Sequence, residues 1–427
     1  MRQKSLMMAA LAMAALAALA ACAQPQAGGI IQSSNQRITS PVANQADLAA
    51  LVDGNNQFAF DLYGALKNDA GNLFCSPYSI SMALAMTYAG ARGATEGQMA
   101  KTLHFALPQD RLHPAFNGLD SQLSELGQGA KGKDGKGFRL NIVNAIWGQK
   151  GYDFLAPFLD TLARNYGAGL RPLDFGAAPE ASRVAINDWV GQKTEGRIKD
   201  LVPPGAIDSL TRLVLTNAIY FNAAWQYPFE KGATADGSFY LLDGSQIKVP
   251  MMRQTKSLRY AGGANYQAVE LPYDGRELSM LVLLPASGQF SAFEKSLDAG
   301  QLKAISGDLG AGRVALTMPR YEFTSSFSLK KTLAAMGMPD AFAGSADFSG
   351  MTGSRDLSIA EVFHKAFVAV DEAGTEAAAA TAVVTRATAM PGSELIEVTV
   401  DRPFIFLIRD DNTGQLLFIG RVLNPGA

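Results

Sequence analysis

A run of small residues near the C-terminus constrains the fold of this chain more than any other feature. Every second position from Thr375 to Thr385 is small or β-branched, whereas charge is confined to the other set, at Glu376 and Arg386. The four alanines at 377–380 would favour a helix by propensity alone. The period of two instead favours a strand that buries its small, uncharged face, with Gly374 as a flexible base. An Ala/Thr-rich surface loop would have the same pattern.

The overall composition limits the class of protein. The 427 residues include 37 Lys and Arg against 39 Asp and Glu, for a formal charge of −2, and 48% are hydrophobic. A disordered chain has fewer apolar residues and more net charge, and a disulfide-stapled mini-protein has many more cysteines than the two found here. No nucleic-acid partner is expected, because such proteins present a basic stripe or domain. The composition indicates a large globular protein with a sizeable core.

The first 22 residues are typical of an export signal. Arg2 and Lys4 precede an uninterrupted apolar run from Leu6 to Leu19, which is too short for a membrane span with its flanks. The sequence around Ala20-Ala21-Cys22 resembles a bacterial lipoprotein signal, which implies cleavage before Cys22 and acylation of its thiol. An ordinary signal peptide, cut after an Ala-x-Ala, would leave Cys22 incidental.

These features divide the chain into three parts. We expect a signal peptide at 1–21, a flexible tether rich in Gln, Gly, Ser and Asn at 22–45, and one folded domain at 46–427. A lipid anchor at Cys22 implies an exported protein that is attached to a bacterial membrane, either in the periplasm or at the cell surface.

Hydrophobic periodicity predicts an α+β body. Helix-like spacing is found at 46–67, 80–89, 157–166, 178–190 and 329–336. Strand-like apolar runs are found at 140–147, 213–221, 278–284, 314–318, 404–408 and 416–419. The two kinds of segment do not alternate regularly, which argues against a doubly wound sheet. The glycine-rich stretch at 127–137 is expected to be a surface loop.

The motifs of common enzymes are missing from the chain. It has three histidines and no nucleophile elbow, zinc-protease motif or phosphate-binding loop. Residues 127–132 match G-x-G-x-x-G, but they follow a helix-like run rather than a strand, so they do not predict a dinucleotide site. Two distant cysteines cannot form a zinc cluster. We therefore expect no catalytic residue, no metal and no cofactor.

Motifs spread along the chain resemble those of the serpin family of serine protease inhibitors. The segment from Glu372 to Thr381 is similar to the hinge of inhibitory members. The other matching segments are 72–80, 186–198, 215–225, 271–273, 278–280, 364–366, 402–404 and 417–422, in the family's order. The resemblance covers essentially all of residues 46–425.

The resemblance implies both a fold and a mechanism. The implied fold has a five-stranded main sheet, two smaller sheets, about nine helices and an exposed reactive loop at about 372–400. In the implied mechanism a serine protease attacks the loop and forms an acyl-enzyme, and it is trapped when the freed limb inserts into the main sheet. The partner is then the target protease, held covalently by a monomeric inhibitor. The alternatives are a non-inhibitory serpin that acts as a carrier or binding protein, and an unrelated lipoprotein hydrolase.

The resemblance also assigns roles to residues of the loop. The hinge comprises Glu372, Gly374, Thr375, Glu376, Ala377, Ala378, Ala379, Ala380 and Thr381. The attacked residue usually lies fourteen positions beyond the hinge glycine, which gives the bond Thr388–Ala389. Its small neighbours suit a protease with a shallow, uncharged pocket, of elastase or subtilisin type. Arg386 is the alternative reactive residue, for a trypsin-like protease.

Four residues outside the loop are implied to control the conformation. Ser76, Asn217 and His364 match the polar network beneath the main sheet of serpins, and Trp225 matches the residue where insertion begins. A lone histidine or tryptophan in an apolar strand is more commonly a core residue, and conformational control is compatible with that role.

Overall fold

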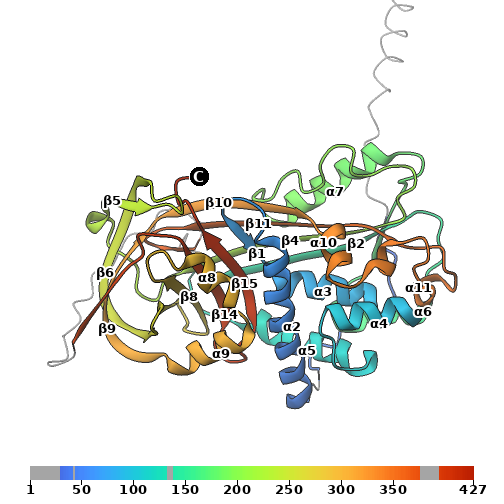
Figure 1. The fold of residues 1–427 in the computed structure, drawn as a ribbon. Coiled ribbons are helices and arrows are strands. Elements are labelled where there is room, and N and C mark those ends of the chain that lie inside the picture. The colour runs from blue at the N-terminus through green and yellow to red at the C-terminus, as the bar shows by residue number, and fades with distance from the viewer. Residues whose placement is uncertain (1–28, 42–43, 132–137, 376–393) are drawn as a thin grey trace, which may run out of the picture.

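The main sheet runs along the length of the molecule (Figure 1). The computed structural model describes residues 29–41, 44–131, 138–375 and 394–427. Within them the strand order of this sheet is β10-β11-β12-β4-β2-β3. The bounds are β10 Tyr321–Ser328, β11 Ile359–Val370, β12 Gly374–Thr375, β4 Leu213–Ala224, β2 Arg139–Gln149 and β3 Leu170–Leu173. Five strands were expected, and the two-residue strand β12 is a sixth, which lies between one end of β11 and one end of β4.

The two smaller sheets that were expected are joined through one long strand, β6 (Gln246–Gly262). Residues 259–262 of β6 pair with β7, residues 246–251 pair with β5, and residues 251–260 pair with β9. The hydrogen bonding therefore continues through the order β1-β15-β14-β8-β7-β6-β9-β13. The bounds are β1 Leu73–Cys75, β5 Ala235–Tyr240, β7 Tyr266–Pro272, β8 Leu278–Pro285, β9 Gly310–Pro319, β13 Leu395–Thr399, β14 Phe404–Asp410 and β15 Leu416–Val422.

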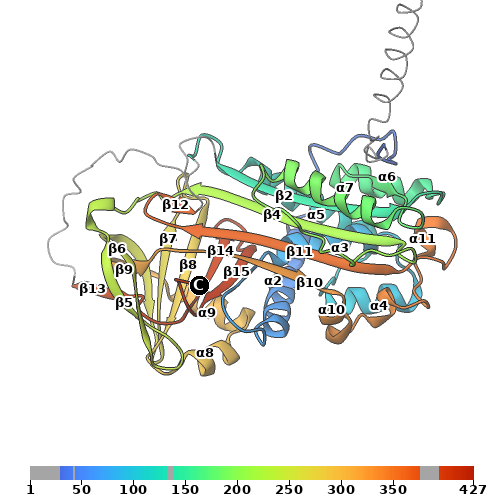
Figure 2. The same ribbon diagram turned by 90° about the horizontal axis from the view of Figure 1, so that it is seen from above.

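Helices cover both faces of the main sheet. Ten α-helices occur in the described residues, against about nine expected: α2 Gln45–Leu66, α3 Pro77–Tyr88, α4 Gly93–Thr102, α5 Gln109–Glu125, α6 Ala156–Tyr166, α7 Pro179–Lys193, α8 Phe290–Ser296, α9 Ala299–Asp308, α10 Lys330–Met336 and α11 Ser349–Thr352. Helix α7 lies alone over one face, and most of the others lie on the opposite side (Figures 1 and 2). Among the described residues no helix has the length and apolarity needed to span a bilayer.

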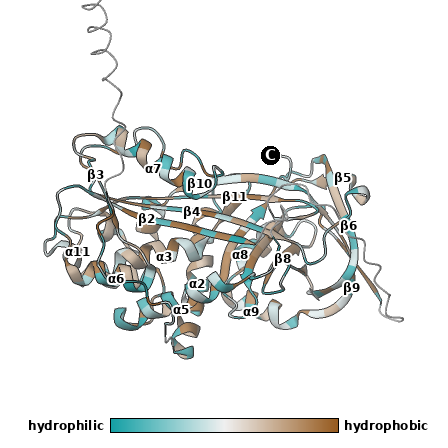
Figure 3. Ribbon diagram, turned by 180° about the vertical axis from the view of Figure 1, so that it is seen from behind, coloured by the Kyte–Doolittle hydropathy of each residue, from teal (hydrophilic) through white to brown (hydrophobic). Residues whose placement is uncertain are grey.

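The core is split by the main sheet. Every residue of α3 is buried, as expected for a helix that is apolar on all sides and lies in the centre of the molecule (Figure 3). This helix belongs to the large core between the main sheet, the second sheet and the other helices. A smaller core fills the space between α7 and the main sheet, around Trp147, Ile186 and Val190. The main sheet therefore lies between two packed layers.

The predicted α+β body and all the predicted helices and strands are confirmed, with small changes at their ends. The long strand β6 and the helices α4 and α5 were not predicted as elements. The helix-like run noted just before residues 127–132 is the end of α5. Cys75 is buried and free in β1. The glycine-rich stretch 127–137 lies partly outside the described residues.

The expectation of a flexible tether needs a correction at residues 29–41. They lie against the body instead. Ile31 exchanges backbone hydrogen bonds with Leu170 of β3, and the guanidinium of Arg37 donates to Asn117 and Asp120 of α5. The segment lacks periodicity because it is held by single backbone and side-chain contacts rather than by a repeating apolar face.

Candidate functional site

The hinge residues enter the main sheet at one end, between β11 and β4. Gly374 and Thr375 pair antiparallel with Ala224 and Ala223 of β4, and Thr375 also pairs with Val370 of β11. Figure 2 shows β12 at this end of the sheet. A side chain at position 374 would place its Cβ 2.1 Å from the carbonyl oxygen of Ala223. Glycine is required here by the close approach of two backbones.

Four aromatic and polar contacts fix the start of the hinge. Trp225 donates from its indole nitrogen to the carbonyl oxygen of Asp371 at 2.9 Å and from its backbone nitrogen to that of Ala373 at 3.0 Å. Its ring stacks on Tyr273, with centroids 4.6 Å apart. The Tyr273 hydroxyl lies 2.7 Å from the Thr375 hydroxyl. Burial raises the pKa of Tyr273, so the phenol remains protonated and able to make this hydrogen bond.

Glu372 anchors the same segment through a buried carboxylate, which is 2% exposed. It accepts hydrogen bonds from the Arg320 guanidinium and from the hydroxyl of Thr234. Burial by itself would raise the pKa of Glu372, but the bonds from Arg320 and Thr234 outweigh it, and the net shift is downward. The backbone oxygen of Glu372 accepts from Phe229 at 2.8 Å.

A second polar cluster lies under the middle of the main sheet, and we call it the buried polar network. It consists of Ser76, Ser79, Asn144, Asn217 and His364. The register places Asn144, Asn217 and His364 side by side on β2, β4 and β11. Ser76 caps the N-terminus of α3, with Pro77 at the first helical position, and its hydroxyl accepts from Ser79 N–H.

The hydrogen bonds of the network hold β4 and β11 together. Asn217 donates to Ser79 and Asn144, and its side-chain oxygen accepts from Nδ1 of His364. The other nitrogen, Nε2, accepts from the backbone N–H of Ser76 at 3.2 Å. This acceptor role requires the neutral tautomer protonated at Nδ1. Burial lowers the pKa of His364 to about 3, so this tautomer is the form present at neutral pH.

The geometry does not equip His364 for proton transfer. Both ring nitrogens are engaged within the network, and neither faces a reactive hydroxyl. Within the described residues no group of three or more His, Cys, Asp or Glu side chains is arranged to hold a metal ion. The network is therefore suited to joining two strands rather than to catalysis.

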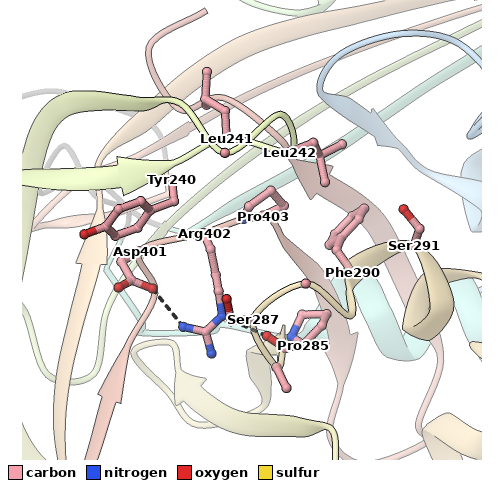
Figure 4. Close-up of a pocket in the computed structure, with 13 residues that line it drawn as sticks. Tyr240, Leu241, Leu242, Pro285, Ser287, Phe290, Ser291, Asp401, Arg402 and Pro403 are labelled. Carbon is pink, nitrogen blue, oxygen red and sulfur yellow. Dashed lines mark hydrogen bonds and ion pairs between the residues drawn. The ribbon is translucent and has the colours of Figure 1, made fainter.

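A cavity of about 510 Å³ lies beside the residues that follow β13 (Figure 4). Arg402 donates to Asp401 at 2.8 Å and to the carbonyl oxygen of Pro285 at 2.9 Å. Asp401 accepts at its backbone oxygen from Tyr240, and Val400 donates to Thr317. The charged side chains that line the cavity are thus paired with each other, and residues 400–402 are bonded to the neighbouring strands.

The structure brings together only some of the predicted site residues. Ser76, Asn217 and His364 meet in one network, and Trp225, Glu372, Gly374 and Thr375 meet at the hinge. The reactive bond Thr388–Ala389, the alternative Arg386, the hinge residues 376–381 and the lipidation residue Cys22 lie outside the described residues.

Sequence reasoning missed five side chains that bond or stack with the predicted residues: Ser79, Asn144, Thr234, Tyr273 and Arg320. Ser79 and Tyr273 lie within motifs that had been recognised, but no role was given to them. Asn144 had a visible signal, since it is a polar residue in the apolar strand-like run 140–147. Arg320 had none, because its partner Glu372 is 52 residues away.

Comparisons with known proteins agree with this architecture. The family model described as serpin (serine protease inhibitor) matches residues 53–425. The leukocyte elastase inhibitor of Sus scrofa is 42% identical over 387 residues, covering 88% of this chain and 99% of the relative. An uncharacterized serpin-like protein of Thermococcus kodakarensis is 40% identical over 376 residues, covering 88% and 86%. Human thyroxine-binding globulin, solved with its ligand, has a TM-score of 0.78 at 31% identity, covering 89% and 99%.

The chain belongs to the serpin family. Its mixed sheets and helices form the serpin fold, and members of this family bind proteases as inhibitors rather than acting as enzymes.

The first prediction concerns the pH dependence of stability. In the unfolded chain His364 has a pKa near 6.5, whereas burial lowers it to about 3 in the fold. Between these values the unfolded chain binds the proton and the native chain does not, so falling pH destabilises the fold by up to about 1.4 kcal/mol per pH unit. His364→Asn lacks this titration.

The measurement is the free energy of unfolding of both proteins by denaturant, from pH 7 to pH 4. The stability advantage of the unmodified chain over His364→Asn should shrink as the pH falls. His113, whose pKa burial lowers to about 4, is present in both proteins and cancels. An advantage that stays constant over this range would contradict the neutral, buried His364.

Proposed function

We propose that this chain inhibits serine proteases by offering the segment 376–393 as a substrate and inserting the cleaved limb into the main sheet. The observation that carries the proposal is the position of Thr375. It already pairs with both β4 and β11, so the two edges that would receive the new strand have accepted its first residues. Family membership and the elastase inhibitors among its relatives support the same function.

The register of the hinge determines where the following residues would pair. Gly374 and Thr375 face Ala224 and Ala223, so each further residue would pair one position lower on β4. Residues 376–385 would then face positions 222–213, which is the remaining length of β4. These are the residues that have the period-two pattern, and the pattern ends where the strand ends. At about 3.3 Å per residue, a protease attached at Thr388 would be moved by roughly 40 Å.

The buried face of the inserted strand follows from Thr375. Its hydroxyl meets the buried Tyr273, so positions of the same parity would face the large core. Those positions are Ala377, Ala379, Thr381, Val383 and Thr385. All are small or β-branched and uncharged, which insertion into a packed interior requires.

Insertion would have to open the buried polar network. β4 and β11 pair in parallel from Leu213 to Ile219 and from Ile359 to Ala366, and the bond between Asn217 and His364 joins them. The hinge register would bring Thr381 opposite Asn217, on the face of the network. Its hydroxyl could replace part of the bond that is lost, which limits the cost of parting the strands.

The proposed target is a protease with a shallow, uncharged specificity pocket, of elastase or subtilisin type. The proposed reactive bond is Thr388–Ala389, whose neighbours are small. Relatives about 40% identical carry the name leukocyte elastase inhibitor. Cleavage after Arg386 by a trypsin-like enzyme would shorten the insertable limb by two residues, about 7 Å of strand, and should trap less efficiently.

We further propose that the protein is a monomer, exported and held at a bacterial membrane by acylated Cys22. The described chain begins beside β3, at the end of the main sheet opposite β12 and β13 (Figure 2). An anchor upstream of this point would let the reactive loop face away from the membrane, where a protease can reach it.

A binding protein without inhibitory activity is the alternative. Thyroxine-binding globulin, which was solved with thyroxine bound, has a similar fold. The hinge argues against this alternative, because the positions that would be buried have no charged, bulky or proline residue from Thr375 to Thr385. Incubation with pancreatic elastase and denaturing electrophoresis separates the two functions. An inhibitor gives a band that contains both proteins and resists detergent, whereas a binding protein gives only cleaved chain.

The second prediction tests the buried face of the hinge. Thr375→Arg should convert the inhibitor into a substrate, because an unpaired charge would have to enter the core beside Tyr273. Glu376→Arg is the matched control, since it adds the same side chain at the next position, on the face that carries charge. On the same gel, Thr375→Arg should give mainly cleaved protein and Glu376→Arg mainly complex. Equal yields of complex would refute insertion in this register.

The third prediction concerns the cleaved bond. Mass spectrometry of the C-terminal fragment released by elastase should find Ala389 as its first residue. Cleavage after Met390 is not expected, because Pro391 would occupy the leaving-group side. If every serine protease tested cut only after Arg386, the target class would be trypsin-like instead.

A further inference from the structure

The cavity beside residues 401–403 is large enough to hold a small molecule, and we call it the Arg402 cavity. Its volume is about 510 Å³, and ligand pockets in proteins usually measure about 300–1,000 Å³. Three parts of the chain enclose it: the turn between β5 and β6, the connection from β8 to α8, and the residues between β13 and β14 (Figure 4). No described residue of the hinge or of the buried polar network lines it.

The turn between β5 and β6 forms one wall and is rigid. The backbone nitrogen of Leu241 donates to Ser245 at 2.8 Å, and that of Gly244 donates to Leu241 at 3.0 Å. The Asp243 carboxylate accepts from both the backbone nitrogen and the hydroxyl of Ser245. Gly244 has a φ of 82°, which few other residues adopt easily. The turn therefore holds Leu242 in a fixed place at the edge of the cavity.

The connection from β8 to α8 forms a second wall. The backbone nitrogen of Ala286 donates to Asn265 at 2.8 Å, and that of Gln289 donates to Ala286 at 2.9 Å. These bonds fix the loop that leads to Phe290, whose buried ring also lines the cavity. Because both walls are held by backbone hydrogen bonds, the cavity is formed before a ligand arrives, and binding requires little ordering of the chain.

The apolar part of the cavity includes two strongly exposed side chains. Tyr240 is 47% exposed and Leu242 is 55% exposed, and of the large hydrophobic residues in the described chain only Leu210 is more exposed than these two. A single exposed apolar residue needs no explanation, but here both line one cavity together with Phe290 and two prolines. A ligand with an apolar body would remove this surface from water, which favours binding.

Arg402 supplies the polar end of the cavity, and its position is fixed. Its Nε donates to the carbonyl oxygen of Pro285 at 2.9 Å, and its Nη1 donates to Asp401 at 2.8 Å. Within the described residues these bonds leave Nη2 without a protein partner, although every guanidinium nitrogen can donate. The Arg402 side chain is 24% exposed, and Figure 4 shows it between Tyr240 and Phe290. The cavity thus contains a fixed cation with unused donors.

The chemistry of the wall favours a carboxylate over a neutral polar group. Besides Arg402, the hydroxyls of Ser287 and Ser291 line the cavity and are able to donate. The charge of Asp401 is offset by the guanidinium that it contacts. A carboxylate only accepts, and its hydrogen bond to a guanidinium is charge-assisted, which makes it stronger than the bond of a neutral acceptor.

We propose that the Arg402 cavity binds a small aromatic carboxylic acid. The carboxylate of the ligand accepts from Nη2 of Arg402, and its aromatic body covers Tyr240, Leu242 and Phe290. Aromatic rings pack well on such a surface, because they can stack on or meet the edges of the tyrosine and phenylalanine rings. This binding site goes beyond the proposed inhibition of proteases and does not depend on it.

The first test uses the unmodified full-length chain and two probes that differ in one group. Naphthylacetate has a carboxylate, and naphthylacetamide has the same aromatic body with a neutral amide. Equilibrium dialysis, read by naphthalene fluorescence, measures the binding of each probe without a protease. We expect the acid to bind at one saturable site with a Kd of about 1 mM or lower, and the amide to bind at least about fivefold more weakly. Equal affinities, or tighter binding of the amide, would overturn the proposed carboxylate ligand.

The second test locates the bound acid by paired variants. Leu242→Ala removes an apolar contact, and Leu210→Ala is its control, because Leu210 is also exposed but lies outside the cavity. Ser287→Trp fills the cavity, whereas Gln289→Trp adds the same side chain to the same loop at a position that does not line it. The two cavity variants should each weaken the binding of naphthylacetate at least about threefold, and the controls should not. Unchanged binding in either cavity variant would overturn this site.

A third variant tests the role of the guanidinium. Arg402→Gln removes the positive charge and leaves Asp401 to repel a carboxylate, so the acid should no longer bind more tightly than the amide. Arg402 also bonds to Pro285, and thermal unfolding therefore checks that the variant is folded. A folded Arg402→Gln protein that still prefers the acid would overturn the role of Arg402. The first two tests do not require this variant.

Discussion

The parallel pairing of β4 with β11 is the constraint on which the rest of the structure depends. These two strands are hydrogen-bonded to each other over residues 213–219 and 359–366, and at the hinge end they are already separated by two residues of β12. The same edges could pair with residues 376–385 of the chain itself. Under the proposed function, the native sheet would be one of two arrangements of this sequence, and the second would have one more full strand.

The closed sheet persists because separating β4 from β11 costs free energy. Parting β4 from β11 breaks the bond between Asn217 and His364 in a fully buried place, where an unpaired polar group costs about 1–3 kcal/mol. Helix α7 and its apolar contacts cover the same strands from the other side. The Arg320–Glu372 pair and Trp225 hold the hinge segment at its entry point. In the proposed mechanism the native state persists because this barrier is high, and not because its fold has the lowest free energy.

The sequence predicted the strands and helices well because apolar residues are regularly spaced along them. Runs such as 140–147 and 213–221 are mainly apolar over a whole strand, and helix α7 was visible from its spacing. The hinge was assigned from its resemblance to that of inhibitory serpins, and the parity of its alternating small residues agrees with the burial of Thr375 on Tyr273. In these cases the local pattern and the tertiary environment require the same residue types.

Other features depend on pairs that no local pattern reveals. Asn144 and Ser79 complete the buried polar network only because three strands and the start of α3 meet at one level of the sheet. Residues 29–41 were interpreted as part of a flexible tether because they show no periodicity, yet Arg37 bonds to Asp120, which is 83 positions away in the sequence. The two smaller sheets are likewise joined because β6 is long enough to pair with three other strands, and composition does not reveal this.

The central claim is that the main sheet is ready to accept a further strand from its own chain, and thermal unfolding before and after a single cut in residues 376–393 tests it most directly. A protease that cleaves the loop without being trapped, such as a metalloprotease, supplies the cut chain. If residues 376–385 insert, ten added residues at about 1 kcal/mol of net hydrogen bonding each should raise the melting temperature by on the order of 10 °C or more. A melting temperature that is unchanged or lower after the cut would contradict the account.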